Sequence, residues 1–163
     1  MATAMNKLYY EDIEVGAIFA GDPVTIERDT MIAFASEWDN QAMHVDQAGA
    51  RAMGLGFDDV IASSALTFAA QSKSINPIYA QLHVLPSGID VKMDFLKPVL
   101  AGDELTASLE VLDKRPSRRG GRGLVDTKVE LLNQNGNPVM TVQSLFLLKM
   151  RPDQAANSPA GVA

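Results

Sequence analysis

A chain of 163 residues, 47% hydrophobic and 21% charged, is long enough to bury one core and has the composition of an ordinary soluble globular protein. Its net charge of −6 argues against a general nucleic-acid-binding protein, because such domains are usually basic. The absence of cysteine excludes disulfides and thiolate metal sites. Residues 1–10 lack the apolar core of a signal peptide, and no segment approaches the roughly 20 apolar residues of a membrane span, so we expect a cytoplasmic protein.

The N-terminal part of the chain predicts a strand followed by a helix. Ile18 to Ile26 favours a strand, although Gly21 to Pro23 would bend it or confine it to a sheet edge. Glu27 to Trp38 predicts a helix, because its apolar residues fall on one face. Asp29 or Thr30 is expected to cap this helix.

A carboxylate and an imidazole follow this helix. Asp39 and His44 stand five residues apart, in a predicted loop whose side chains can point into a cleft. Held close together, the two groups can share a bound water and exchange protons with it. A carboxylate–imidazole hydrogen bond that only ties the loop would explain the same spacing. Asp46 is predicted to cap a second helix, Val45 to Met53.

A long helix is predicted to start near Ser63 or Ser64, either of which can cap it. Asn76-Pro77 is expected to end this helix, because a residue before proline is disfavoured in the helical region. The following stretch, Ile78 to Gly88, predicts a loop or lid. His83, within that stretch, is assigned a structural or surface role.

The remainder of the chain predicts four strands. In the first, Ile89 to Phe95, apolar and polar residues alternate, which indicates one buried face. A strand, then helices, then strands joined by hairpins predicts an α+β fold in which an antiparallel sheet wraps around one long helix. The other predicted strands are Leu105 to Leu112, Leu124 to Leu132 and Val139 to Lys149.

The stretch from Asp39 to Asp46 resembles the signature of the MaoC-like dehydratases, the family that contains the (R)-specific enoyl-CoA hydratases. The usual form of that signature is Asp-x-Asn-Pro-x-His-x-Asp. Gln41 matches a branch that carries glutamine in place of the asparagine, and Ala42 replaces the proline.

The start of the long helix carries a second resemblance to this family. Ile61-Ala62-Ser63-Ser64 is similar to the family's Ile-Ala-x-Gly, with Ser64 where glycine is usual. The resemblance covers residues 9–151 and implies the hotdog fold. Residues 1–163 would then form a single domain, with a core of residues 9–151 and a flexible tail of residues 152–163.

Hydration of an α,β-unsaturated thioester needs a proton acceptor for the water, a proton donor for C2 and polarisation of the carbonyl. The resemblance implies that Asp39 and His44 act on a shared water; which of them is the base stays open, because coupled groups titrate as a pair. It also implies that the backbone around Ser63, Ser64 and Ala65 polarises the carbonyl, since a helix N-terminus carries partial positive charge.

Substrate contacts are expected at Gln41 and at a basic hairpin tip, Asp113 to Gly123. The tip can be a solvated turn that keeps the sheet edge from aggregating, or it can contact the phosphates of coenzyme A through Arg118, Arg119 and Arg122. The tip holds five of the 14 Lys and Arg residues of the chain: Lys114, Arg115, Arg118, Arg119 and Arg122.

The implied activity is conversion of trans-2-enoyl-CoA to (R)-3-hydroxyacyl-CoA, or the reverse, in fatty acid metabolism. No metal or cofactor is expected beyond the coenzyme A or acyl carrier protein of the substrate. A homodimer is expected, because a lone sheet exposes an edge strand. The alternative is a hotdog protein that binds acyl thioesters, or assembles with a partner subunit, without hydrating them. A thioesterase is disfavoured, because no carboxylate lies between Ile61 and Ile78, on the central helix where such enzymes usually carry theirs.

Overall fold

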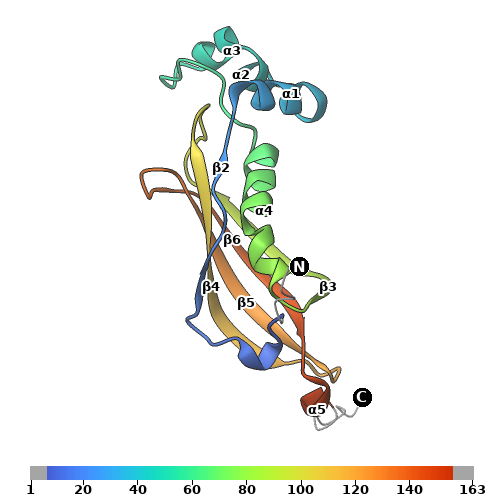
Figure 1. Ribbon diagram of the computed structural model, residues 1–163. Coiled ribbons are helices and arrows are strands. Elements are labelled where there is room, and N and C mark those ends of the chain that lie inside the picture. Colours follow the sequence, from blue (N-terminus) through green and yellow to red (C-terminus); the bar gives the residue numbers. More distant parts are fainter. Residues whose placement is uncertain (1–6, 156–163) are drawn as a thin grey trace, which may run out of the picture.

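The computed structural model describes residues 7–155. Its centre is an antiparallel sheet with the strand order β1-β4-β5-β6-β3, in which β2 also pairs with β4. The long helix α4 lies along one face of this sheet, and three shorter helices gather at one end of it (Figure 1). This arrangement confirms the predicted α+β fold. The helices are α1 (Arg28–Trp38), α2 (Ala42–Val45), α3 (Gln47–Ala52) and α4 (Ser64–Ala80).

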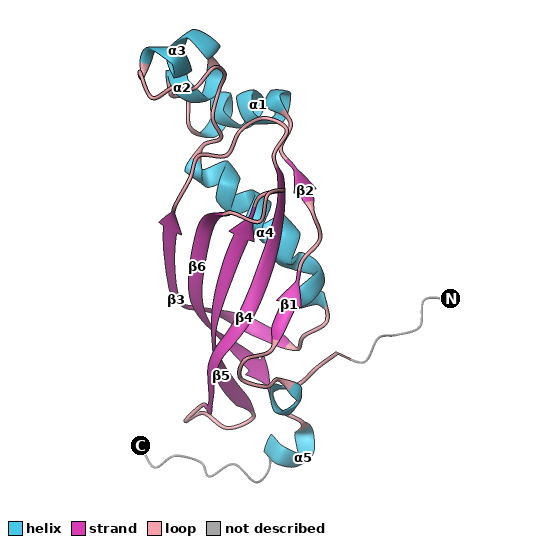
Figure 2. Ribbon diagram, turned by 90° about the vertical axis from the view of Figure 1, so that its left-hand side faces the viewer, coloured by secondary structure: helices cyan, strands magenta, loops and turns pink. Residues whose placement is uncertain are grey.

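β4, β5 and β6 are joined by hairpins as predicted, but β3 pairs with β6, so its connection to β4 is not a hairpin (Figure 2). These are the four strands that follow α4. Each of them is longer than the alternation of apolar and polar residues predicted, because twisted hairpin strands keep pairing beyond the buried part of the sheet. The strands are β1 (Ile18–Ala20), β2 (Val24–Thr25), β3 (Val84–Phe95), β4 (Glu104–Pro116), β5 (Arg122–Leu132) and β6 (Pro138–Lys149).

The predicted first strand is broken into β1 and β2. Between them Asp22 turns toward α4, where its N–H donates to the Ser74 carbonyl at 3.0 Å and its own carbonyl accepts from Ser74 Oγ at 2.6 Å. Gly21 permits this approach, because a Cβ there would lie 2.4 Å from the Ser74 carbonyl oxygen. The break therefore ties the start of the sheet to the middle of the long helix.

The predicted end of the long helix at Asn76-Pro77 is wrong, since α4 continues through Pro77 to Ala80. A proline inside a helix costs about 3 kcal/mol, because it removes one hydrogen bond and clashes with the preceding turn. Ile75 and Ile78, each 2% exposed, are buried on either side of it. Burial of two such side chains contributes about 1.5–3 kcal/mol each and outweighs that cost.

The predicted loop or lid between Ile78 and Gly88 is also wrong. Its first residues belong to α4, and β3 begins at Val84, which pairs with Leu148 of β6. Pro86 is tolerated in β3 because this strand lies at the sheet edge and its pairing register with β6 shifts between Leu85 and Asp90.

The face of β3 that was predicted to be buried is open in the single chain. Val91, Met93 and Phe95 are 51%, 41% and 46% exposed. β3 is the last strand in the sheet order, and its free edge has no neighbour among the described residues. An apolar edge of this kind is a surface on which another strand can pair.

The opposite end of the sheet is closed by the N- and C-terminal segments. A short 3₁₀ helix, η1 (Tyr10–Asp12), packs there, and the Tyr10 ring fills the space above Gly123 of β5. Of the predicted tail, Pro152–Ala155 form α5, and residues 156–163 lie outside the described part of the chain. None of the described helices is both long and apolar enough to cross a membrane.

Candidate active site

Asp39 and His44 come from two adjacent helix ends. Asp39 is the C-cap of α1, where its N–H donates to the Ala35 carbonyl at 2.9 Å. His44 lies within α2, a one-turn helix, and not on the predicted loop. At the other end of α1, Glu27 is the N-cap and makes no side-chain cap, so the cap predicted at Asp29 or Thr30 is wrong.

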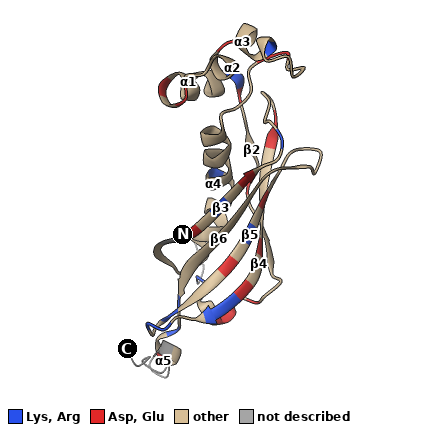
Figure 3. Cartoon of the chain, turned by 180° about the vertical axis from the view of Figure 1, so that it is seen from behind, with Lys and Arg blue, Asp and Glu red and all other residues tan. Residues whose placement is uncertain are grey.

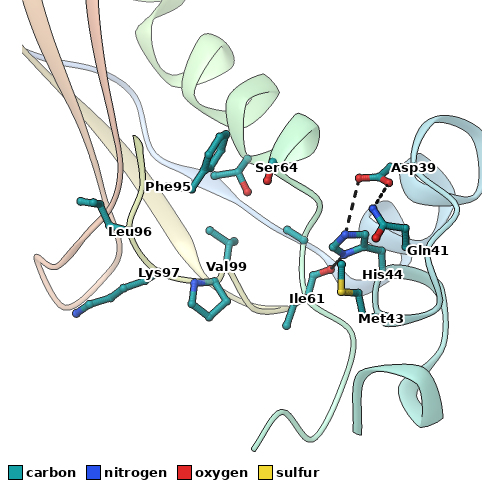
Figure 4. Close-up of a pocket in the computed structure, with 13 residues that line it drawn as sticks. Asp39, Gln41, Met43, His44, Ile61, Ser64, Phe95, Leu96, Lys97 and Val99 are labelled. Carbon is teal, nitrogen blue, oxygen red and sulfur yellow. Dashed lines mark hydrogen bonds and ion pairs between the residues drawn. The ribbon is translucent and has the colours of Figure 1, made fainter. Parts of the chain in front are cut away.

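The imidazole of His44 is held in one tautomer by the backbone. Its side chain is buried, and Nδ1 lies 2.8 Å from the carbonyl oxygen of Ile61 (Figure 4). Because a carbonyl only accepts, Nδ1 carries a proton and donates it. In the neutral ring Nε2 is therefore without a proton and can accept one.

His44 Nε2 faces the carboxylate of Asp39 at 3.8 Å from Oδ2. This distance is too long for a direct hydrogen bond, and one water beside the gap can donate to both acceptors. Gln41 fixes the carboxylate, since its Nε2 donates to Asp39 Oδ1 at 2.7 Å. The amide thus occupies one carboxylate oxygen and leaves the other directed at the imidazole.

The two groups line a cleft of about 360 Å³ between the helical end and the sheet. Its other wall is the segment that leaves β3, which brings Phe95 and the following loop opposite the helices (Figure 4). The lining residues are Asp39, Gln41, Met43, His44, Ile61, Ala62, Ser64, Thr67, Phe95, Leu96, Lys97, Pro98 and Val99.

The N-terminus of α4 opens into the same cleft. Ser63, one of the two predicted caps, is its N-cap, and its Oγ accepts from the Leu66 N–H at 3.2 Å. Within the described residues the N–H groups of Ser64 and Ala65, in the first turn, have no hydrogen-bond partner. Ser64 is exposed and lines the cleft, whereas the Ser63 side chain is buried and used in the cap.

Asp46 and His83, the other two candidates from the sequence, make structural contacts. Asp46 caps α3, as predicted, by accepting from the Gly49 N–H at 3.1 Å. His83 lies outside the cleft, where its ring stacks on Tyr9 with 4.1 Å between the centroids. Asp39 and His44 are therefore the imidazole–carboxylate pair that the fold brings to the cleft.

The basic hairpin tip lies at the end of the sheet remote from α1, α2 and α3 (Figure 3). Lys114 is bound within the chain, because its Nζ donates to the carbonyls of Tyr10 and Ile13. Arg115 Nη1 lies 3.6 Å from Asp113 Oδ2, and Arg118 and Arg119 are exposed. Within one chain the tip does not line the cleft.

Sequence reasoning missed several parts of the cleft. The Ile61 carbonyl that orients His44 is a backbone group, which no residue pattern reveals. Thr67 and Phe95 were assigned only to a helix and a strand, although both line the cleft. No group of three or more metal-ligating side chains occurs among residues 7–155.

Comparison with known proteins places this arrangement in a family. Residues 14–133 match the family described as MaoC like domain. The chain is 30% identical over 140 residues to the uncharacterized protein YdeM of Bacillus subtilis, a match that covers 85% of this chain and 97% of YdeM.

Solved structures of similar fold include a MaoC-like dehydratase from Rhodospirillum rubrum, with a TM-score of 0.78 and 29% identity, covering 89% of this chain and 99% of that one. The R-hydratase PhaJ1 of Pseudomonas aeruginosa matches with a TM-score of 0.64 and 27% identity, covering 89% and 88% of the two chains.

Proposed function

Because this chain belongs to the MaoC-like dehydratase family, we propose that it adds water to an acyl thioester or removes it, with trans-2-enoyl-CoA and (R)-3-hydroxyacyl-CoA as the reacting pair. The observation that carries the proposal is the gap of 3.8 Å between His44 Nε2 and Asp39 Oδ2 on the wall of the cleft. The likeness to an R-hydratase supports the (R) configuration of the product.

In the hydration direction, a water between Asp39 and His44 Nε2 donates its protons to them and turns its lone pairs toward the substrate. The water oxygen forms a bond with C3 while one O–H bond breaks and its proton passes to the pair. The electrons of the C2=C3 double bond move toward the thioester carbonyl. A proton returned by the pair then forms the C2–H bond, so one water supplies both added groups.

The charge that develops on the thioester oxygen needs donors that are already in place. The free N–H groups of Ser64 and Ala65 point out of the first turn of α4, a helix of 17 residues whose N-terminus carries partial positive charge. A carbonyl oxygen bound there would gain stabilisation as it becomes an enolate oxygen. Among residues 7–155 Asp39 and His44 interact with Gln41, the Ile61 carbonyl and each other and not with the Ser64 hydroxyl, so the proposed role of Ser64 is to shape the site.

The active form would be a homodimer in which the free edges of β3 pair. Pairing would remove the open edge and cover the apolar face of Val91, Met93 and Phe95. Two β3 strands related by a two-fold axis run antiparallel, so each basic hairpin tip would come to the end of the sheet where the partner's cleft lies. The tip could then contact the phosphates of coenzyme A across the interface.

The direct test is hydration of trans-2-enoyl-CoA esters by the purified protein. Absorbance of the conjugated thioester should fall, and chiral analysis of the hydrolysed product should give the (R)-3-hydroxy acid. Saturable binding of the same esters without loss of absorbance would refute hydration and favour a thioester-binding protein. An (S) product would refute the assigned stereochemistry.

A further inference from the structure

A second cavity of about 280 Å³ lies between α4 and the sheet. It begins one helical turn beyond the cleft, since Thr67 lines the cleft and Gln71, four residues later, lines the cavity. Four residues of α-helix correspond to about 6 Å along the helix axis. The cavity is lined by Phe68, Gln71, Ser72, Ile75, Asn76, Tyr79, Val91, Val129, Val142 and Ser144, none of which is charged.

Gln71 differs from the other buried polar residues of the described chain. It is 4% exposed, and no hydrogen bond of its side chain occurs among residues 7–155. The other buried polar or charged residues are His44, Ser63, Thr67, Ser74, Asp103 and Thr127, each with a side-chain partner.

The Gln71 amide is directed into the cavity. Among the described residues, every side-chain nitrogen or oxygen atom that is fully buried has a hydrogen-bond partner. The amide of Gln71 has no partner and must therefore retain access to open space, and the space that it lines is this cavity. A group that pairs with this amide would therefore be bound favourably.

The surroundings of Gln71 select the kind of group. Thr127 Oγ1 and Ser144 Oγ lie 3.1 Å apart, and Ser144 and Tyr79 both line the cavity. Phe68 of α4 and Val91 of β3 provide apolar parts of the lining. Because no charged side chain lines the cavity, a carboxylate or ammonium group would lose its hydration without a counter-charge.

We propose that this cavity holds the distal part of the acyl chain and that Gln71 binds an uncharged oxygen function, a hydroxyl or a carbonyl, carried on that part. The inference rests on the proposed acyl-thioester substrate and extends it to a specific class of acyl group. Seven residues separate Ser64 from Gln71, about 10 Å along the axis of α4. The oxygen function therefore lies several carbons beyond the thioester.

The test is calorimetric binding of saturated acyl-CoA esters, which cannot be hydrated. Hexanoyl-, octanoyl- and decanoyl-CoA are compared with their terminal hydroxy derivatives. At the chain length that reaches Gln71, the hydroxylated ester should bind about 3- to 10-fold more tightly than the plain ester, as one added neutral hydrogen bond permits. Gln71→Leu should abolish or reverse this preference.

Gln143→Leu is the matched control, because Gln143 is exposed and lies outside this cavity, and the variant should keep the wild-type preference. Equal binding of plain and hydroxylated esters by the wild-type protein at every length would overturn the inference, and so would absence of acyl-CoA binding. The wild-type comparison does not depend on whether Gln71→Leu folds.

The two proposals fail separately. A wild-type protein that hydrates enoyl-CoA esters but shows no preference for hydroxylated chains retains the proposed function and loses this inference. A protein that prefers hydroxylated chains but hydrates no enoyl-CoA keeps the cavity assignment and loses the proposed reaction.

Discussion

Replacement of Gln41 by leucine removes the hydrogen bond that holds Asp39. The amide donates to Asp39 Oδ1 at 2.7 Å, and leucine has nearly the same volume but no donor. A hydrogen bond to a charged group contributes about 1.5–3 kcal/mol. The Asp39 side chain is 28% exposed and Gln41 is exposed, so the lower end of that range applies, and it corresponds to about a tenfold change in rate.

We therefore expect Gln41→Leu to lower kcat for enoyl-CoA hydration about tenfold and to leave KM nearly unchanged. Gln47→Leu is the control, because the Gln47 amide also makes one hydrogen bond, to the Asp58 carbonyl at 2.8 Å, but does not contact Asp39. Steady-state kinetics of the two variants measure the difference. A higher KM with unchanged kcat in Gln41→Leu would refute the positioning role and show that Gln41 contacts the substrate instead.

Three other results are expected. Replacement of Arg118, Arg119 and Arg122 by Gln should raise KM and weaken its salt dependence without lowering kcat; an unchanged KM would leave the hairpin as a solvated tip. The hydrogen bond from Arg28 holds the pKa of Asp59 below its usual value, so this pair stabilises the fold above the ordinary aspartate pKa, about 3.9, and its contribution is lost as pH falls through the lower folded value. Asp59→Asn should therefore lose less unfolding free energy than the wild type as pH falls, measured by urea unfolding. A pH dependence identical to that of the wild type would contradict that linkage. Light scattering should give a dimer, and a fully active monomer would exclude the β3 pairing.

Short-range patterns predicted the sheet because its strands alternate and its turns carry characteristic residues. The alternation of β3 and the hairpins among β4, β5 and β6 were visible without any tertiary information. The Asp46 and Ser63 caps were found for the same reason, since each cap is a contact over three residues.

Long-range packing decided the features that the sequence did not predict. Pro77 stands inside α4 because Ile75 and Ile78 are buried around it, and a propensity rule cannot weigh that burial. The pattern of β3 predicted a buried face but could not tell whether this chain or a second one covers it. Asp39 and His44 were found from their spacing, whereas the tautomer of His44 depends on the Ile61 carbonyl, 17 residues away.

The central claim is that Asp39 and His44 act together on one water. The measurement is kcat for hydration of a trans-2-enoyl-CoA ester by Asp39→Asn, His44→Ala and the double variant, with His83→Ala as the control outside the cleft. Each single change should lower kcat roughly 100- to 10,000-fold while binding of the ester and folding persist. The double variant should lose little more than the worse single one, because groups that act as a unit are not additive. If Asp39→Asn retains more than about a tenth of the wild-type kcat, this acid–base account is contradicted.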